Sequence, residues 1–203
     1  MRQLNVGLIG CGSFVRGMHI PNLHNNAKYT IFAAMDIDQT AAQTVKEQTG
    51  AQYATTDIDR LLADKDIDVV FITTRHDSHA ELTIKAARAG KHILCEKPMG
   101  LNIHECQAIA AAVTASGVKY TVGYNRGMAP LVTEARNLLR DLPQKRLIYH
   151  RIQAPFPEDS WTHNPVIGGG RFVGEGCHIF DLLCELVPAP PVSVFASGGT
   201  FLD

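Results

Sequence analysis

The first half of the sequence alternates short apolar runs with segments of helical periodicity, and this order constrains the fold more than any other feature. The run from Val69 to Ile72 lacks polar alternation, as expected for a strand that is covered on both faces. Strands that alternate with helices predict an α/β fold, in which right-handed helical crossovers join the strands of a doubly wound parallel Rossmann sheet. Strands are expected at Leu4–Ile9, Thr30–Met35, Val69–Thr73, His92–Cys95 and Tyr120–Gly123, and helices at Phe14–Asn25, Thr40–Gly50, Ala80–Ala89 and Ile103–Ser116.

The pattern changes after Gly123, and we divide the chain there. Residues 1–123 are predicted to form a dinucleotide-binding domain, and residues 124–203 the start of an α/β C-terminal domain with an open sheet. One or two strands and a helix bury too little surface to be stable alone, so the second domain is expected to be truncated. Its expected elements are a helix at about Pro130–Leu142, a strand at Leu147–Gln153, a helix from the triple glycine 168–170 through Val187, and a strand at Val192–Ala196.

The composition excludes several classes of protein. The 19 basic and 20 acidic residues include no Lys/Arg block, so nucleic acid is not an expected partner. No apolar stretch approaches the roughly 20 residues that cross a bilayer, and the N-terminus has no signal-peptide pattern, which predicts no membrane partner and a cytoplasmic location. The cysteines have no C-x-x-C spacing and are predicted to be buried thiols. They are Cys11, Cys95, Cys106, Cys177 and Cys184.

A glycine pattern between the first strand and the first helix predicts a dinucleotide site. Gly10 permits the tight turn, and Gly12 lets the backbone approach a pyrophosphate at the helix N-terminus. Ser13 adds a hydroxyl, and Phe14, which begins the helix, is included among the cofactor-binding candidates. Val15 replaces the third glycine of the fingerprint and is expected to loosen the packing of helix against strand. The alternative is that the loop is only a structural turn.

Asp36 ends the second strand, about twenty residues beyond the glycine loop. A carboxylate at this place accepts hydrogen bonds from the adenosine ribose hydroxyls and repels a 2′-phosphate. No Lys or Arg lies beside it, so we predict NAD rather than NADP. The alternative is that Asp36 or Asp38 only caps the helix that starts near Thr40.

The triplet Glu96-Lys97-Pro98, which follows the fifth strand, resembles the glucose–fructose oxidoreductase/inositol dehydrogenase (Gfo/Idh/MocA) family. Further landmarks of that family occur in the same order over nearly the whole chain: the segment 89–94, the run 123–126, and the triple glycine 168–170 leading to His178 and Asp181. The resemblance implies a Rossmann domain followed by an α/β domain whose large open sheet serves oligomerisation. A homodimer or homotetramer is therefore expected.

Hydride transfer from an alcohol carbon to a nicotinamide needs a base for the hydroxyl proton and a positive group for the developing alkoxide. Lys97 lies at the carboxyl end of a parallel strand, where open sheets bind ligands. The resemblance implies that Lys97 contacts the substrate hydroxyl and the nicotinamide ribose, that Glu96 helps to position it, and that His178 is the general base and contacts substrate. The alternatives are a solvated surface lysine and a structural histidine.

The chain departs from the family next to this histidine. Family members usually carry Asp four residues before it, where this chain has Gly174. Glu175, three residues before His178, can share its helix face and is predicted to be the catalytic carboxylate. The substitution can instead mark a subgroup with another substrate or without the usual reaction. Glu175 and His178 also have a Glu-x-x-His metal spacing, but a di-iron site needs a second copy that is not visible, so no metal is expected.

The fourth strand ends in a loop where the family more often has Thr-Pro-Asn followed by a histidine. Thr74 and His79 match this pattern, whereas Arg75 and His76 depart from it. We expect Thr73 or Thr74 to touch the cofactor, and Arg75 or His76 to reach its adenine or ribose side. His79 is a cofactor-binding candidate, or it simply begins the next helix.

Two further groups are candidates near the substrate. The residues Tyr124, Asn125 and Arg126 leave the sixth strand at the domain junction, where they are expected to contact nicotinamide or an anionic substrate, or to pack as a hinge. Trp161 and His163 precede the triple glycine and are candidates for stacking and hydrogen bonding with substrate, or they anchor the loop.

These residues predict an NAD-dependent dehydrogenase that acts on a hydroxyl of a sugar, a sugar derivative or a cyclitol, because polyhydroxylated substrates dominate the family. Two alternatives stay open. One is a glycosidase-type enzyme that retains NAD and oxidises its substrate transiently. The other is a regulator that senses the dinucleotide without chemistry, which the loss of Asp at position 174 allows and the presence of Lys97 and His178 disfavours.

Overall fold

The computed structural model describes residues 2–140, 142, 147–153, 159–187 and 189–199. These residues form two compact units. The first comprises Met1–Tyr124 and Gln153–Cys177, and the second Asn125–Ile152 and His178–Asp203. The stretch Gln153–Cys177, which the sequence assigns to the second domain, thus packs with the dinucleotide-binding part.

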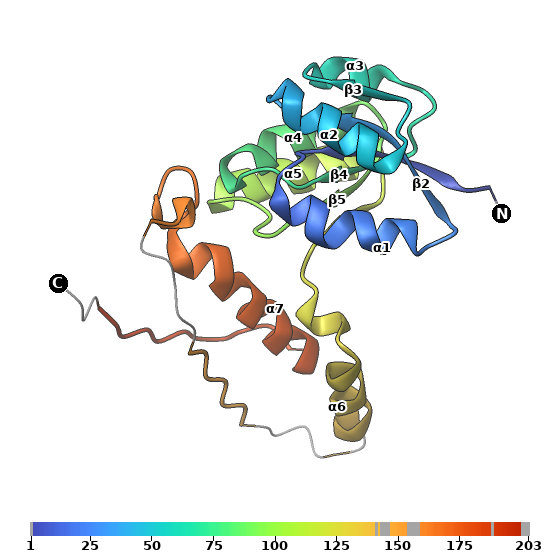
Figure 1. The fold of residues 1–203 in the computed structure, drawn as a ribbon. Helices are drawn as coiled ribbons and strands as arrows, with labels where there is room; N and C mark the ends of the chain where they lie inside the picture. Colours follow the sequence, from blue (N-terminus) through green and yellow to red (C-terminus); the bar gives the residue numbers. More distant parts are fainter. Residues whose placement is uncertain (1, 141, 143–146, 154–158, 188, 200–203) are drawn as a thin grey trace. The chain divides into compact units, whose positions relative to one another are not determined.

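The first unit is built on a six-stranded parallel sheet with the order β3-β2-β1-β4-β5-β6 (Figure 1). The order reverses between β1 and β4, which makes the carboxyl ends of these two strands the topological switch point where such sheets bind ligands. The predicted doubly wound sheet is confirmed. The strands are β1 (Leu4–Ile9), β2 (Tyr29–Met35), β3 (Tyr53–Thr55), β4 (Val69–Ile72), β5 (His92–Cys95) and β6 (Tyr120–Val122).

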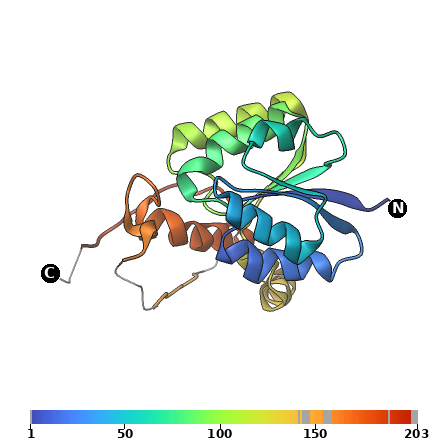
Figure 2. The ribbon, with the colours of Figure 1, turned by 45° about the horizontal axis from the view of Figure 1, so that its top comes forward.

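Helices cover both faces of this sheet (Figure 2). α1 (Ile20–His24) and α2 (Gln39–Thr49) lie on one face, and α3 (Ile58–Ala63), α4 (His79–Arg88) and α5 (Ile103–Ser116) lie on the other. The helix predicted at Phe14–Asn25 is divided, because a π turn, η1 (Val15–His19), precedes α1. The sequence did not predict β3 or α3, which are only 3 and 6 residues long.

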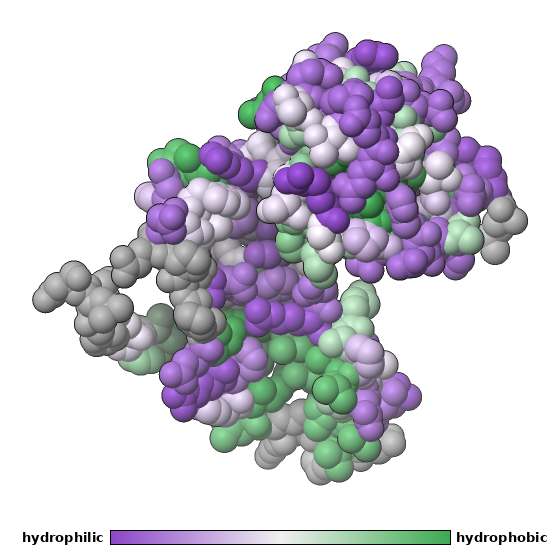
Figure 3. All heavy atoms as spheres, viewed as in Figure 1, coloured by the Kyte–Doolittle hydropathy of each residue, from purple (hydrophilic) through white to green (hydrophobic). Residues whose placement is uncertain are grey.

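The second unit contains η3 (Arg126–Met128), α6 (Pro130–Arg140) and most of α7 (Cys177–Leu186). Hydrophobic residues form much of its visible surface (Figure 3), and Leu131, Leu138 and Phe180 are exposed. The strands predicted at Leu147–Gln153 and Val192–Ala196 are wrong for the described residues, which form no strand there. A strand needs a hydrogen-bonded neighbour, and no described segment pairs with either stretch.

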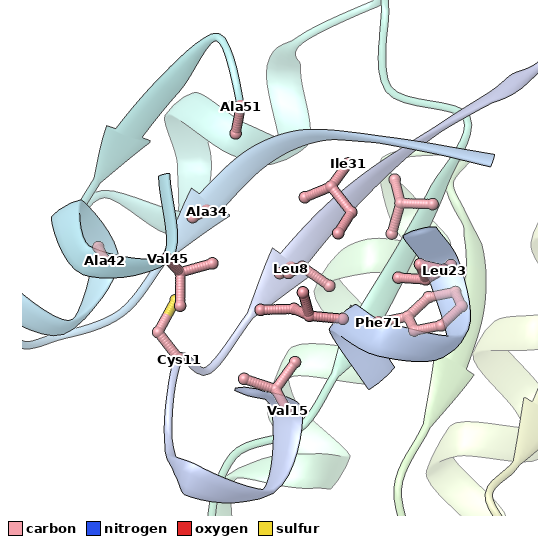
Figure 4. Packing of buried hydrophobic residues seen from close by; sticks show 12 residues of the cluster. Leu8, Cys11, Val15, Leu23, Ile31, Ala34, Ala42, Val45, Ala51 and Phe71 are labelled. Carbon is pink, nitrogen blue, oxygen red and sulfur yellow. The ribbon is translucent and has the colours of Figure 1, made fainter. Parts of the chain in front are cut away.

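The core beside α1 and α2 shows how the glycine loop is anchored (Figure 4). Val15 is completely buried in the same cluster as Leu8 and Phe71. The side chain of Val15 thus lies between helix and sheet, and the looser packing expected there stays a prediction.

The cysteines are only partly as predicted. Cys11 and Cys95 are buried, and Cys106 and Cys177 are partly buried. Cys184 is exposed, and the prediction of a buried thiol is wrong there, because no described residue covers that face of α7.

Candidate active site

The glycine loop has a backbone that a side chain would disturb. Gly10 has φ +96°, and a Cβ at this position would lie 2.9 Å from the backbone carbonyl of Thr73. Gly12 has no atom within 4 Å of the corresponding position, so its backbone is open to a ligand. Thr73 ties the loop to β4, since its Oγ1 donates a hydrogen bond of 2.8 Å to the carbonyl of Gly10. The loop is thus fixed on one side and accessible on the other.

Asp36 closes the same end of the site. One carboxylate oxygen accepts a hydrogen bond from the backbone N–H of Cys11 at 2.6 Å, and the other from that of Asp38 at 2.9 Å. Asp38 caps α2 by accepting from the Thr40 N–H, so the capping alternative applies to Asp38 and not to Asp36. Burial, followed by the charge of Asp36, raises the pKa of the Cys11 thiol to about 12, so this side chain is a neutral packing group.

A cleft of about 880 Å³ extends along these groups at the carboxyl ends of the strands. It brings together most of the residues that the sequence singles out in the first unit. Those that line it are Gly10, Gly12, Ser13, Phe14, Asp36, Thr73, Thr74, Arg75, His76, Glu96, Lys97 and Trp161.

His79 is the sequence-predicted residue of the first unit that lies behind the cleft wall. Its ring is fully buried, with Nδ1 2.8 Å from the carbonyl oxygen of Pro98 and Nε2 3.2 Å from that of Thr74. Burial lowers its pKa. His79 also begins α4, as the structural alternative expected, and it joins two loops that follow β4 and β5.

Lys97 and Glu175 form an ion pair at the other end of the cleft. The Nζ atom of Lys97 donates to the backbone carbonyl of Gly174 at 3.0 Å and lies 3.2 Å from Oε1 of Glu175. Gly174 and Glu175 belong to a π turn, η5 (Phe172–Gly176), that runs directly into α7. The structure therefore places the predicted replacement carboxylate in contact with the predicted catalytic lysine.

A smaller cavity of about 120 Å³ adjoins this ion pair. His76, Lys97 and Thr162 line both this cavity and the large cleft, so the two spaces meet at these residues. The remaining wall consists of Ser160, Gly170, Arg171, Gly174 and Glu175.

His19 is a site residue that the sequence analysis missed. Its Nε2 lies 2.8 Å from Oε1 of Glu96, and its ring meets the rings of Phe14 and Phe71 edge to face, with centroids 5.6 and 5.5 Å apart. A Cβ at Gly123 would lie 2.9 Å from the same Glu96 oxygen, so Glu96 is confined between two segments. The one signal in the sequence was a histidine in an otherwise apolar stretch behind the glycine loop.

Trp161 lies in a short 3-10 turn, η4 (Trp161–His163), that packs against the loop after β4. The ring of His76 meets it edge to face at 4.7 Å, and the guanidinium carbon of Arg75 lies 5.8 Å from its centroid. The backbone N–H of Asp77 also donates to the carbonyl of Ile167. His163, by contrast, is exposed and lines neither cavity.

Comparison with known proteins identifies the family. Residues 4–124 match the sequence model of GFO_IDH_MocA, described as an oxidoreductase family with an NAD-binding Rossmann fold. The chain belongs to this family. The predicted resemblance is thereby confirmed.

Related proteins of the Gfo/Idh/MocA family extend over almost all of the chain. Inositol 2-dehydrogenase of Rhizobium meliloti is 32% identical over 197 residues, which are 97% of this chain and 59% of the relative. Myo-inositol 2-dehydrogenase of Thermotoga maritima is 28% identical over 98% of this chain and 60% of its own length. A solved levoglucosan dehydrogenase, in complex with NADH and levoglucosan, is 28% identical, with a TM-score of 0.78 over 92% of this chain and 54% of its own. The chain thus spans about three fifths of the curated relatives.

The remaining predicted residues of this Gfo/Idh/MocA chain lie in the second unit. His178 is buried on α7, and Asn125 precedes η3, which begins at Arg126. Burial, followed by the charge of Glu185, raises the pKa of Asp181 on the same helix. The roles predicted for His178, Asn125 and Arg126 stay predictions.

Within the described ranges, no group of three or more His, Cys, Asp or Glu side chains is placed to hold a metal ion. The described helices also include none that is long and apolar enough to cross a membrane.

Proposed function

We propose that the chain supplies the cofactor site and the catalytic lysine of an NAD-dependent dehydrogenase that oxidises a hydroxyl carbon of a sugar, a sugar derivative or a cyclitol. The names of the related inositol and levoglucosan dehydrogenases support this substrate class. A cytoplasmic location and a homodimer or homotetramer are part of the same proposal.

The residues of the large cleft fit a dinucleotide. Gly10 and Gly12 form a cradle that a Cβ would fill or narrow, and the backbone of Gly12 is open to an approaching phosphate. Asp36, held by two backbone N–H groups, presents a fixed carboxylate to the ribose hydroxyls and disfavours a 2′-phosphate. A volume of about 880 Å³ lies in the range of cofactor sites. When bound, NAD supplies the acceptor for the substrate hydride.

The observation that carries the proposal is the position of Lys97, which lines both the dinucleotide cleft and the smaller cavity. A substrate in the smaller cavity would therefore adjoin the cofactor at this lysine. The Lys97 ammonium group can donate a hydrogen bond to the reacting oxygen and stabilise negative charge there as the hydride leaves. Glu175, at 3.2 Å, orients the ammonium group and offsets part of its charge.

His178 is proposed as the base that takes the proton of the reacting hydroxyl. It follows Glu175 by three residues, in the helix into which η5 runs, and an imidazole suits proton transfer near neutral pH. Asn125 and Arg126 are proposed to contact nicotinamide and substrate, respectively. Trp161 lines the cleft and is proposed to pack against substrate or nicotinamide.

The test is titration with NAD and NADP, followed by an assay for NADH formation with inositols, aldoses, levoglucosan, uronates and amino sugars. We expect NAD to bind and at least one polyol to reduce it. The Lys97→Ala variant should bind NAD with nearly unchanged affinity but turn over about 100-fold to 10000-fold more slowly. Lys65→Ala, at an exposed position, is the matched control.

The possible outcomes separate the alternative functions. Stoichiometric NADH release supports a dehydrogenase, whereas product formation without NADH release indicates a retained cofactor. If NAD binds and no compound is converted, the dinucleotide-sensing alternative is favoured. Undiminished turnover in Lys97→Ala would contradict the role of the lysine.

A further inference from the structure

His76 is a buried side chain that faces both cavities. It begins a 3-10 turn, η2 (His76–Ser78), after β4 and is only 6% exposed. Its Nδ1 lies 2.8 Å from the carbonyl oxygen of Gly168, which can only accept a hydrogen bond. Nδ1 therefore carries the hydrogen, and in a neutral ring Nε2 is left as an acceptor. No described residue forms a hydrogen bond with Nε2, although the ring lines both the cleft and the smaller cavity.

The surroundings keep this ring neutral at physiological pH. Burial lowers the pKa of His76 below its ordinary value of 6.5, and His79 and Lys97 act in the same direction. The carbonyl of Gly168 and the charge of Asp77 oppose the shift without reversing it. The other charged groups around the ring are Arg75 in the preceding loop and Glu175 and Arg171 across the smaller cavity. The Nε2 lone pair is thus available above about pH 6.5.

Gly174 provides the space that the ring occupies. A Cβ at position 174 would lie 3.2 Å from Cε1 of His76, closer than the 3.4–4 Å of an ordinary contact. Another residue at 174 would therefore push the ring aside, while Trp161 meets the ring at a centroid distance of 4.7 Å. His76 and Gly174 are also two positions at which the chain departs from its family's sequence pattern. Because the two residues lie side by side in the wall of the smaller cavity, the two departures form one change in that wall.

We propose that His76 binds substrate, with Nε2 accepting a hydrogen bond from a hydroxyl group that lies next to the reacting hydroxyl. This proposal rests on the proposed dehydrogenase function, in which the reacting hydroxyl lies at Lys97. His76 and Lys97 both line this cavity of about 120 Å³, so a hydroxyl held at His76 lies close to one held at Lys97. A neutral acceptor selects a hydroxyl over a carboxylate, which has no proton to donate. The substrate class is therefore a vicinal diol.

The variant His76→Asn separates a binding role from a structural one. The asparagine amide can donate to the Gly168 carbonyl in place of Nδ1, but it has no group at the position of Nε2. We expect KM for the polyol to rise about three- to tenfold, the range of one lost neutral hydrogen bond. His24→Asn makes the same chemical change at an exposed position and should leave KM unaltered.

A monodeoxy analogue tests whether the contact is with a neighbouring hydroxyl. With myo-inositol as the probe, removal of the hydroxyl next to the reacting carbon should raise KM for the unsubstituted protein but not further for His76→Asn. Acidification below the lowered pKa of His76 should raise KM for the unsubstituted protein, because protonation of Nε2 removes the acceptor. The His76→Asn variant should not show this rise.

Nitrogen NMR of the histidine rings supplies a readout that does not depend on turnover. Addition of myo-inositol to the NADH complex should shift the Nε2 resonance of His76. If the Nε2 resonance shifts but no NADH forms from NAD, the binding role of His76 stands and the dehydrogenase function is rejected. If His76→Asn turns over the polyol with an unchanged KM, the binding role of His76 is rejected and the dehydrogenase function stands. The same conclusion follows if the protein oxidises a polyol that does not shift the Nε2 resonance of His76.

Discussion

The two ends of the large cleft are held in different ways. At the dinucleotide end, backbone groups fix the polar atoms: Asp36 is bound by the N–H groups of Cys11 and Asp38. At the other end, side chains from distant segments hold one another, as Lys97 does with Glu175. The first arrangement joins residues 25 positions apart in the chain, and the second joins residues 78 positions apart.

This difference indicates which end can change between relatives. Backbone N–H groups are present whatever the side chains are, so the dinucleotide end depends on few residue identities. The Lys97 end depends on the identity of every partner, and a substitution there alters the shape and charge of the smaller cavity. The departures from the family's pattern at His76 and Gly174 lie at this end. Substitutions at the Lys97 end are therefore expected to alter substrate choice more than cofactor binding.

Glu175→Gln is expected to give the largest effect that separates the two ends. The substitution keeps the size of the side chain and removes the charge that lies 3.2 Å from the Lys97 ammonium group. We expect kcat to fall about 100-fold, because the lysine loses its orienting partner, while the Kd for NAD changes less than about twofold. Steady-state kinetics and NAD titration measure the two effects separately.

A second ion-paired carboxylate provides the control. Glu185 lies 2.5 Å from Arg136 within the second unit, and Glu185→Gln should leave kcat within about twofold, as exposed pairs contribute little. Equal losses in the two variants would mean that Glu175 acts on stability rather than on the lysine.

Gly10→Ala tests the backbone-held end. At φ +96° an alanine is strained, and its Cβ would lie 2.9 Å from the carbonyl of Thr73. We expect a loss of about 1–3 kcal/mol of folding stability and a Tm lower by several degrees in thermal unfolding. Gly12→Ala, which meets no atom within 4 Å, should change Tm little. If the two variants unfold alike, the loop is less constrained than its geometry indicates.

Much of the fold follows from short-range patterns in the sequence. The apolar runs of β1, β4 and β5 and the caps of α5 lie within contiguous stretches, and their predicted bounds agree with the structure to within one residue. β3 was missed because three residues carry no periodicity, and it forms by pairing with β2. The strand expected at 192–196 shows the converse, since an apolar run without a partner forms no ladder in the described residues.

The candidate site likewise contains residues that the sequence predicts and contacts that it does not. Gly10 and Asp36 were predictable because the glycine loop and the end of the second strand lie at a fixed distance from each other in the sequence. The contacts of His19 with Glu96 and of His76 with Gly168 join segments that are 77 and 92 positions apart, and no local pattern specifies them. Sequence periodicity indicates which face of an element is buried, but not which distant side chain meets it.

Asp36→Ser is expected to alter cofactor choice without altering the Lys97 end. Loss of the carboxylate removes the acceptor for the ribose hydroxyls and the repulsion of a 2′-phosphate, so NAD should bind about tenfold more weakly and NADP more tightly. Adding Ile37→Arg, at a side chain that is 90% exposed, should favour NADP further. Fluorescence titrations with both cofactors give the ratio of affinities. An unchanged ratio in the double variant would contradict the placement of the ribose at Asp36.

The smallest expected effect concerns His19, which supports Glu96 at the boundary between the two ends. A glutamine can place its amide nitrogen near the position of Nε2 and donate to Glu96, whereas an asparagine is too short. Both His19→Gln and His19→Asn lose the edge-to-face contacts with Phe14 and Phe71, so both should unfold at a lower temperature. Only His19→Asn should also lower kcat/KM, by about three- to fivefold. In that variant Glu96 loses its hydrogen bond with residue 19, which holds the carboxylate beside the backbone N–H of Lys97. Equal kcat/KM values in the two variants, at equal stability, would make His19 a packing residue and leave Glu96 held by Gly123 and its own strand alone.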